Sequence, residues 1–447
     1  MGMGSGRHRR ALAGVLATAL LAAGCGGGAS EEASFTDSPQ CEPYRAYQGH
    51  SGTTVSAFAG IRDVEGVNLE QAWRLFSDCT GIKIDYEGSG EFEKEVQARA
   101  AGGDAPDVAF FAQPGMIPKL VADGAAKPAS AATKRLAEQN WPADWLTYGT
   151  VNNTFYAAPL GANVKSFVWY SPATFKKKGY AVPETWDELI TLSKKIAADG
   201  VKPWCAGIES GAATGWPATD WLEDTMLRTA GPETYDKWVA HDLPFNDPAV
   251  VEATDRVGSI LKNPRFVNGG FGGVTSVART PFQTAGLPIL RGRCAMHRQA
   301  SFYALQFPSG TKVAEDGDVY AFYFPAVDPA KGKPVLGGGE FVVAFADRPE
   351  VQAFQTFLAS AEFATTRVEL GSWVSANRNV KIEAYTGTID KLSAEILRDP
   401  KAVFRFDGSD LMPGSVGAGS FWTGMTDWIN GEDTRDTLDA IEASWKD

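Results

Sequence analysis

The feature that most constrains the fold is a regular alternation of strand-like and helix-like segments near the start of the chain. The strand-like segments are rich in β-branched and aromatic residues, and the segments between them place apolar residues on one helical face. They are, in order, 53–60 (strand), 68–81 (helix), 82–88 (strand), 91–103 (helix) and 106–112 (strand). Strands that alternate with helices form parallel sheets with helices packed on both faces. The sequence therefore predicts an α/β fold.

A second alternation begins near Val164. Its helix is predicted over 183–200, because Thr185 stands at the start as an N-cap and Glu188 lies at the capping-box position. The chain has 447 residues, more than one typical domain contains, so at least two hydrophobic cores are expected. Further helices are predicted over 349–371 and 434–446, and the glycine-rich stretch 268–277 is expected to be a loop.

The first 24 residues have the pattern of a secretory signal peptide. A basic segment at 7–10 precedes an apolar stretch at 11–23, which is too short to span a bilayer as a permanent helix. The cleavage region resembles the lipobox of bacterial lipoproteins, which implies that 1–24 is removed and that Cys25 receives the lipid. The alternative is an ordinary secreted protein with an incidental cysteine at this position.

Residues 25–40 are rich in Gly, Ser and acidic residues and contain almost nothing to bury, so we expect a flexible tether. Signal and tether together predict an extracytoplasmic protein that is anchored by its lipid to the outer face of the cell membrane. The net charge of −12 argues against a nucleic acid as partner, because displacing counterions requires a basic surface.

Four further cysteines lie beyond the lipobox: Cys41, Cys79, Cys205 and Cys294. An even number of cysteines in an oxidising compartment indicates two disulfides, for which three pairings exist. No metal site is expected, because the few histidines after the signal show no CxxC or HExxH spacing. No cofactor is expected either, since the glycine-rich stretches 88–90 and 269–273 do not complete a dinucleotide fingerprint.

Four stretches carry a family resemblance: FSDCTGIKIDYEG (76–88), ARAAGGDAPDVAFFAQPG (98–115), APLGANVKSFVWYSPATFKKKGYAVPETWDELITLSKKIAADG (158–200) and MPGSVGAGSFWTGMTDWINGEDTRDTLDAI (412–441). They resemble the extracellular solute-binding proteins of ABC importers, in the sugar-binding branch that includes maltose-binding protein. The resemblance covers nearly the whole chain after residue 53. Within the branch it is nearest to binders of alpha-glucosides and oligosaccharides.

The resemblance implies a two-lobe, periplasmic-binding-protein-like α/β fold with three crossovers and an interlobe cleft. The crossovers are expected at about 158–163, 323–328 and 372–378. Lobe 1 would comprise 41–160 and 327–375, and lobe 2 would comprise 161–326 and 376–447. This architecture favours the pairings Cys41–Cys79 and Cys205–Cys294, because each bridge then stays inside one lobe and leaves the hinge free to move.

A sugar presents weakly apolar ring faces, which stack on aromatic rings, and hydroxyl groups, which need dense hydrogen bonding. The resemblance assigns stacking roles to Trp422, in SFWTG, and to Phe302. Trp216 stands beside Asp220 in ESGAATGWPATDW, whereas Trp221 begins an expected helix and is the more probable core ring. Trp373, at the third crossover, and Phe271, in the glycine-rich loop, complete the aromatic candidates. Core packing is the alternative for each ring, except for Phe271, which could be an exposed loop residue without a role.

The expected hydroxyl-binding residues lie on loops and crossovers, mostly at the ends of predicted strands, where ligands of open α/β sheets bind. They are Glu91, Gln113, Asn163, Lys165, Asp220, Gln299, Glu340, Arg405 and Asp410. Asp407 lies near the last two. Glu91 also stands near a helix start, so the alternative is that it only complements the helix dipole.

The sequence thus predicts a monomeric, lipid-anchored receptor that captures an alpha-linked di- or oligosaccharide and delivers it to the permease of an ABC transporter. One alternative is a secreted glycoside hydrolase, which needs two facing carboxylates. The other is an adhesin or sensor lipoprotein with the same fold. No GxSxG, HExxH or P-loop motif is present to support an enzyme.

Overall fold

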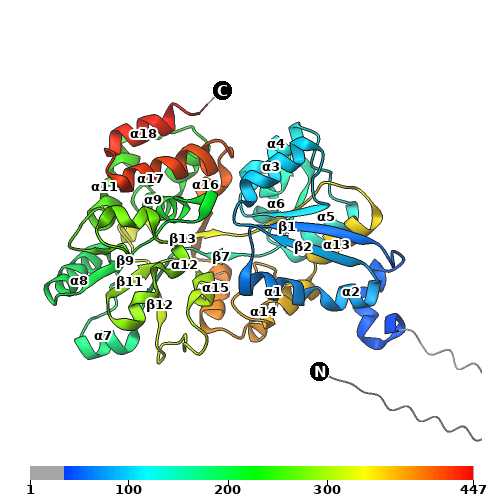
Figure 1. Ribbon diagram of the computed structural model, residues 1–447, viewed down its shortest axis with the longest axis horizontal. Coiled ribbons are helices and arrows are strands. Elements are labelled where there is room, and N and C mark those ends of the chain that lie inside the picture. The colour runs from blue at the N-terminus through cyan, green and yellow to red at the C-terminus, as the bar shows by residue number, and fades with distance from the viewer. Residues whose placement is uncertain (1–34, 446–447) are drawn as a thin grey trace, which may run out of the picture.

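The computed structural model describes residues 35–445, which form two lobes side by side (Figure 1). The predicted signal peptide, most of the predicted tether and Cys25 lie outside the described residues. Within the described part, no helix is both long enough and apolar enough to cross a membrane.

Lobe 1 is built on a five-stranded sheet in the order β2-β1-β3-β14-β6. Its strands are β1 (Thr54–Ala59), β2 (Lys83–Gly88), β3 (Val108–Phe111), β6 (Ala157–Pro159) and β14 (Phe341–Ala344). β1 runs parallel to β2 and β3, and β14 runs antiparallel to both of its neighbours. The parallel arrangement agrees with the strand and helix alternation in the sequence.

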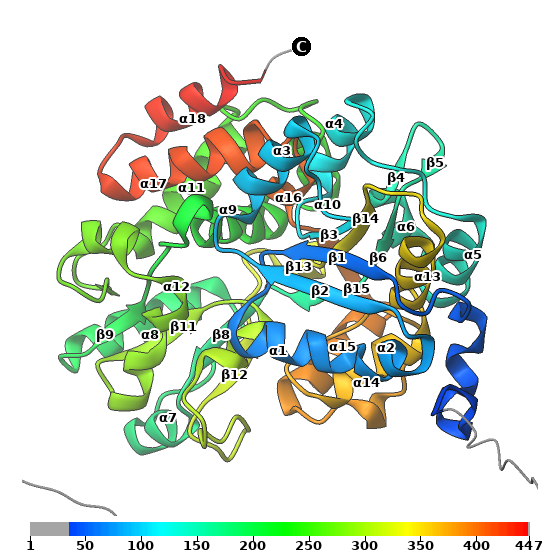
Figure 2. The same cartoon turned by 45° about the vertical axis from the view of Figure 1, so that its right-hand side comes forward.

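Helices cover both faces of this sheet (Figure 2). One face packs on α1 (Asp63–Ala72), α2 (Arg74–Thr80), α13 (Pro349–Leu358) and α14 (Ala361–Glu369). The other packs on α3 (Phe92–Gly102), α4 (Ile117–Ala122) and α6 (Ala143–Tyr148), with α5 (Ala131–Asn140) and the hairpin β4–β5 (Thr150–Val151, Thr154–Phe155) at the edge. Each face therefore has its own apolar core, as the α/β prediction requires.

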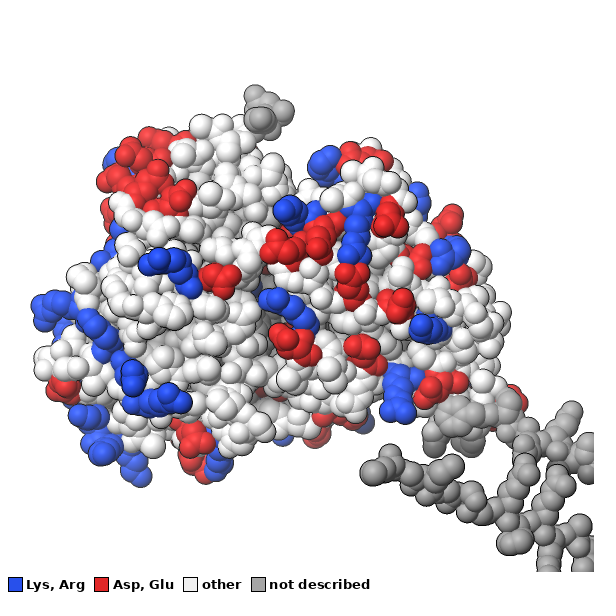
Figure 3. Space-filling model, viewed as in Figure 1, with Lys and Arg blue, Asp and Glu red and all other residues white. Residues whose placement is uncertain are grey.

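Lobe 2 has a second five-stranded sheet in the order β10-β9-β11-β8-β12. Its strands are β8 (Phe167–Tyr170), β9 (Lys202–Cys205), β10 (Val267–Asn268), β11 (Cys294–Arg298) and β12 (Tyr320–Tyr323). Its longer helices are α7 (Pro172–Lys178), α8 (Trp186–Ala198), α9 (Trp216–Thr229), α10 (Pro232–Val239), α11 (Pro248–Leu261), α17 (Trp422–Asn430) and α18 (Thr434–Glu442). Acidic side chains gather over α18 at one end of this lobe, and basic ones lie along its opposite side (Figure 3).

A three-stranded sheet between the lobes carries the crossovers. It consists of β7 (Asn163–Val164), β13 (Lys333–Gly338) and β15 (Ala402–Phe406), with β13 in the middle. The first crossover joins β6 to β7 within the expected range. The second runs along β13, later than the expected 323–328, because Val327 still packs against the lobe 2 core. At the third, Val374 pairs with Ala162.

The segment after residue 376 begins at the junction rather than inside lobe 2. Its helix α15 (Thr388–Arg398) places Ile389 against a lobe 2 core and Ala394 against a lobe 1 core. β15 then joins the central sheet, and the chain enters lobe 2 at α16 (Gly408–Leu411). A helix with two apolar sides can pack on both lobes. The predicted bounds assigned 376–447 to lobe 2 alone and so did not include a helix that both lobes share.

The two expected disulfides, Cys41–Cys79 and Cys205–Cys294, are both present. The first ties a 3₁₀ segment, Pro39–Tyr47, to the end of α2. Phe35–Asp37 also form a 3₁₀ turn that contacts α2, so the last residues of the predicted tether are not extended linker. The side-chain amide of Gln48 donates hydrogen bonds to the carbonyls of Thr36 and Cys79, which fixes this segment against the lobe.

Local signals decide where helices start and stop. The predicted capping box is present, since the Thr185 hydroxyl accepts from the Glu188 amide and the Glu188 carboxylate accepts from the Thr185 amide. The helices predicted over 68–81 and 349–371 are each broken in two, at Trp73 and at Ala359–Ser360. The Ser360 hydroxyl accepts a hydrogen bond from the Phe363 amide and so forms the N-cap of α14. Such a cap stabilises a helix that begins directly after Ser360.

Candidate ligand-binding site

A cavity of about 220 Å³ lies between the lobes. Its walls come from the loops that follow β1, β2 and β3 in lobe 1, from the start of α9 and the segment after β11 in lobe 2, and from the central crossovers. Several of these loops leave the carboxyl ends of parallel strands, the position at which open α/β sheets bind ligands. The fold therefore produces one site from both lobes.

The lobe 2 wall is aromatic. Trp216, at the first turn of α9, lies 5.0 Å from Phe282 and 6.1 Å from Phe302 between ring centroids. Trp422 also lines the cavity, and its indole N–H donates to the Ser409 hydroxyl. Trp221 lies in the core instead, with its ring against Trp204. The structure thus separates the two tryptophans of ESGAATGWPATDW as the sequence suggested.

The facing wall is polar and rich in carboxyl groups. Gln113 and Asn163 line the cavity, and each has a buried side-chain oxygen without a hydrogen-bond partner. Glu340 follows Gly337–Gly339, and burial, together with the nearby Glu65, raises the pKa of its carboxyl to about 7. Burial likewise raises the pKa of Glu65. Unpaired polar atoms facing a cavity can satisfy a polar ligand.

Lys165 forms the floor of the cavity. It follows β7, and its amide donates to the Leu336 carbonyl of β13, which fixes the side chain beneath the crossover. The ammonium Nζ lies 2.5 Å from Asp407 Oδ2, 3.1 Å from Asp220 Oδ1 and 3.4 Å from Asp410 Oδ2. Burial alone would lower the pKa of Lys165, but these carboxylates raise it well above its ordinary value.

The floor continues as a buried network into lobe 2. Arg298 pairs with Asp220 at 3.5 Å and with Asp224 at 3.0 Å, and Asp224 also pairs with Arg228. Arg228 in turn donates to the carbonyls of Phe324, in lobe 2, and of Pro334, on β13 at the second crossover. The network therefore connects the cavity floor to the second crossover.

Burial shifts the pKa values of several acids in this network. Burial raises the pKa of Glu223 and of Asp410 well above the usual carboxyl range, and raises that of Asp220 to about 7. Burial would raise the pKa of Asp407 too, but the Lys165 ammonium and hydrogen bonds from neighbouring carboxyls hold it below its ordinary value. The network thus places five acidic groups beside the cationic Lys165, Arg228 and Arg298, and burial favours the neutral form of Glu223 and Asp410.

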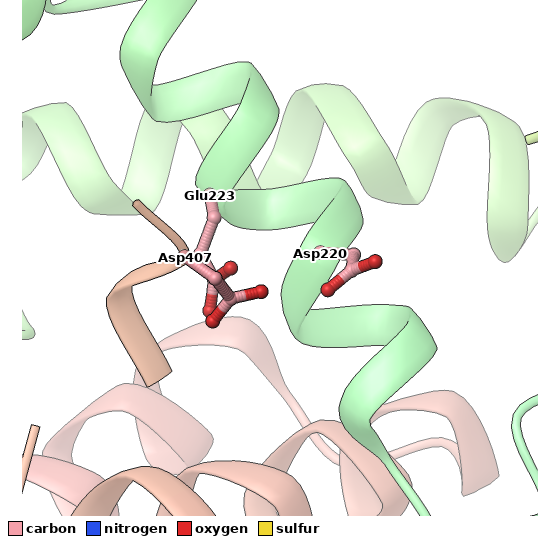
Figure 4. Close-up of side chains that lie close together, drawn as sticks. All are labelled: Asp220, Glu223 and Asp407. Atoms are coloured by element: carbon pink, nitrogen blue, oxygen red, sulfur yellow. The ribbon is translucent and has the colours of Figure 1, made fainter. Parts of the chain in front are cut away.

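Asp220, Glu223 and Asp407 place carboxylate oxygens within 4.8 Å of one another, close enough to hold a cation (Figure 4). Two of the three come from one side of α9, and Asp407 faces them from the segment before α16. The Lys165 ammonium already lies against Asp220 and Asp407. The protein's own lysine therefore supplies the positive charge that this cluster needs.

The structure brings eight of the predicted binding residues to the cavity wall: Gln113, Asn163, Lys165, Trp216, Phe302, Glu340, Asp410 and Trp422. Trp373 lines a small adjoining recess. Asp220 lies one layer below, paired with Lys165 and Arg298.

Four further predicted residues lie off the cavity wall. The Glu91 carboxylate accepts the Ala212 amide of the opposite lobe at 3.2 Å. Gln299 is buried, and its side-chain oxygen accepts the Ala300 amide. Arg405 pairs with Asp236 at 2.6 Å on the outside of β15, and Phe271 is 76 % exposed on its loop. Glu91, Gln299 and Arg405 lie on segments next to the cavity or the central sheet, whereas no residue of the Phe271 loop at 269–273 lines the cavity.

Sequence reasoning missed several lining residues: Arg62, Asp63, Glu65, Phe92, Glu93, Phe282, Gln283 and Gln306. Arg62 and Asp63 directly follow the first predicted strand, so the rule that ligands bind at strand carboxyl ends would have found them. Phe282 and Gln306 lie on short helical turns after irregular stretches, where the sequence carries no comparable signal.

The raised pKa of Glu340 predicts a pH-dependent contribution to stability. An acid whose folded pKa is raised stabilises the fold at low pH, and this contribution is lost as pH rises from its ordinary 4.5 to about 7. We therefore compare the free energy of unfolding of Glu340→Gln with that of wild type at pH 4.5 and at pH 7.5. At roughly 1.4 kcal/mol per pH unit, the difference in favour of the variant should be larger at pH 7.5 by up to about 3 kcal/mol. Urea titrations at both pH values measure this.

The exposed variant Glu70→Gln makes the same charge change on α1 and serves as the control. A constant difference between Glu340→Gln and wild type across this pH range would contradict the prediction.

Comparisons with known proteins agree with this geometry. The profile of the bacterial extracellular solute-binding protein family matches residues 65–365. The alpha-glucosides-binding periplasmic protein AglE of Rhizobium meliloti (strain 1021) is 39 % identical over 411 residues, 89 % of this chain and 88 % of the relative. The osmoprotective compounds-binding protein GgtB of Synechocystis is 40 % identical over 380 residues, 84 % of this chain and 89 % of the relative.

Solved structures share the two-lobe fold at low sequence identity. The bacterial solute receptor AcbH superimposes with a TM-score of 0.74 at 18 % identity, covering 88 % of this chain and 97 % of that one. Maltose-bound MalE3 of T. maritima superimposes with a TM-score of 0.65 at 16 % identity, covering 88 % and 98 %. The expected two-lobe architecture is confirmed. By its family profile and its full-length relatives, this chain belongs to the bacterial extracellular solute-binding proteins, which are receptors and not enzymes.

Proposed function

We propose that the protein captures an alpha-linked di- or oligosaccharide between its lobes and delivers it to an ABC permease. The observation that carries the proposal is the opposition of two unlike walls across one cavity. The rings of Trp216, Phe302 and Trp422 offer faces for the C–H surface of a sugar ring. Gln113, Asn163 and the carboxyl groups opposite offer acceptors and donors for its hydroxyls.

The names of the two full-length relatives support a solute receptor, and one of them names a sugar derivative as the ligand. AglE is named for alpha-glucosides and GgtB for osmoprotective compounds, and both align with most of this chain. A carboxyl whose pKa is raised, such as Asp410, can donate a hydrogen bond to a sugar hydroxyl as well as accept one. A site of this kind suits neutral ligands, which need both roles.

We further propose that the receptor acts as a monomer held at the outer face of the membrane by a lipid on Cys25. The lipobox-like sequence and the polar stretch after it support this part of the proposal. Mass spectrometry of the protein extracted from membranes tests it. A diacylated N-terminal cysteine is the expected result, and a soluble mature protein that begins elsewhere would overturn the anchor without affecting the receptor role.

Isothermal titration calorimetry with a panel of alpha- and beta-linked glucosides tests the ligand class. We expect binding of at least one alpha-glucoside at micromolar or lower Kd. Absence of sugar binding together with clear binding of an amino acid, a peptide or a metal ion would overturn the proposal. Hydrolysis of a bound disaccharide over hours would instead favour a hydrolase.

A further inference from the structure

The cavity is bounded on one side by a direct contact between the lobes. Glu91, just before α3 of lobe 1, accepts the amide of Ala212 in the lobe 2 turn Gly211–Ala213 at 3.2 Å. Gly211 fits against the same carboxylate, since a Cβ added to it would lie 2.9 Å from Glu91 Oε1. This contact joins the two lobes directly at one edge of the cavity.

A second contact closes the cavity beside Gln113 and Asp410. The lobe 1 turn Pro114–Met116 packs against α16 of lobe 2. Gly115 touches the backbone there so closely that an added Cβ would lie 2.0 Å from the Met412 carbonyl oxygen. A side chain of any size at Gly115 would therefore force the two segments apart.

The space between the lobes is small for a carbohydrate. A dry cavity of about 150 Å³ accommodates one benzene molecule. The 220 Å³ between the lobes is thus comparable to one pyranose ring with a small second unit, and not to a chain of three rings.

A recess of about 20 Å³ adjoins the cavity toward the hinge and shares Asn163, Phe302 and Glu340 with it. This is room for one water or one hydroxyl group. Trp373 lines the recess, is 5 % exposed, and has an indole N–H without a hydrogen-bond partner. Asn163 Oδ1 is likewise buried and unpartnered. A hydroxyl is the group that can accept from one and donate to the other.

We propose that the closed cleft is a bounded site for a compact glycoside of one or two units, with one ligand hydroxyl seated in the recess between Trp373 and Asn163. The inference rests on the proposed sugar-binding function and narrows it. On this proposal, the lobe contacts at Glu91 and Gly115 limit the size of the ligand that the closed cleft can hold. It also assigns to Trp373 the role of a hydrogen-bond donor to the ligand.

A size series on the wild-type protein tests the bounded cavity. Calorimetry with methyl α-glucoside, maltose, trehalose, maltotriose and maltotetraose should show the tightest binding for a one- or two-ring ligand. The ligands with three and four rings should bind at least 100-fold more weakly. Equal or tighter binding of maltotriose would overturn the inference and leave the sugar receptor intact, whereas failure of every sugar to bind would overturn both.

The recess is tested with Trp373→Phe, which removes the indole N–H but keeps an aromatic ring beside Arg367. The best-binding ligand should lose about 3- to 10-fold in affinity, the effect of one neutral hydrogen bond. One monodeoxy analogue of that ligand should bind the variant and the wild type equally, because it lacks the seated hydroxyl.

Trp141→Phe is the matched control. Trp141 is also a buried tryptophan with an unpartnered indole N–H, but it lies in the lobe 1 core away from the cavity. Its affinity should stay within twofold of wild type. An equally small effect of Trp373→Phe would show that the recess holds only water, and an equal loss for every deoxy analogue would show that no single hydroxyl occupies it. Either outcome overturns the seated hydroxyl.

Discussion

Replacing Lys165 with Met should lower the free energy of unfolding by about 3–5 kcal/mol, the range for removing one partner of a buried ion pair. The ammonium is within 3.5 Å of Asp220, Asp407 and Asp410, and all four side chains are buried. Without it, Asp220 and Asp407 remain buried with no nearby cation except Arg298 in the described part of the chain. Guanidinium denaturation at pH 7.5 measures the loss.

The same variant gives a second, pH-dependent result. Without Lys165, the pKa values of Asp220 and Asp407 should both be raised, so the folded state binds protons that the unfolded state releases. The deficit in unfolding free energy should therefore shrink as pH falls from 7.5 toward 5. A deficit that is constant with pH would show that lost packing, and not the unpaired charge, destabilises the variant.

Two controls separate the buried network from a general effect of losing a lysine. Lys119→Met removes an exposed lysine that pairs with Asp123 at 2.7 Å, and should change stability by less than about 1 kcal/mol. The double variant Lys165→Met/Asp407→Asn should recover part of the loss, because it removes one of the stranded charges. A loss of less than 1 kcal/mol for Lys165→Met itself would contradict the prediction.

Local patterns predicted individual elements inside the lobes, whereas the two-lobe arrangement was expected from the family resemblance. The strand at 53–60 and the Thr185 capping box are encoded within a few residues, and the structure has both. The second crossover was expected at 323–328, but Phe322, Phe324 and Val327 all pack in or against one lobe 2 core, and the chain passes between the lobes only along β13. Apolar character tells that a residue is buried, but it does not tell which of two cores buries it.

The site was predictable by segment but not by side chain. Trp216 and Asp220 lie on one helix four residues apart, yet Trp216 faces the cavity and Asp220 the buried floor. Arg405 lies on a strand, and the next residue, Phe406, is fully buried. Because successive side chains of a strand point to opposite faces, a shift of one position decides between core and surface. Lys165 was expected to contact the ligand, but its partners come from α9 and from the α16 segment, and only the tertiary structure brings these together.

The disulfide Cys205–Cys294 links two strands whose exits build the cavity. β9 leads through Ala206 to the loop that ends at Trp216, and β11 leads to Phe302. The bridge also closes a long loop, since its cysteines have a sequence separation of 89, compared with 38 for Cys41–Cys79. Longer loops lose more unfolded-state entropy when they are cross-linked.

Replacing Cys205 and Cys294 with serine should therefore lower the free energy of unfolding by about 3–4 kcal/mol and should also weaken ligand binding. The weaker binding follows because the spacing of Trp216 and Phe302, 6.1 Å between centroids, depends on strands that are no longer tied. Denaturation with and without reductant measures the first effect, and calorimetry with the best-binding sugar measures the second.

The variant that lacks Cys41 and Cys79 is the matched comparison. That bridge holds the N-terminal 3₁₀ segment to α2, on a part of lobe 1 that contributes nothing to the cavity wall. We expect a somewhat smaller loss of stability, about 2–3 kcal/mol, with ligand affinity unchanged. Equal losses of affinity in both double variants would contradict the argument, because they would trace the effect to general loosening and not to the strands that carry the aromatic wall.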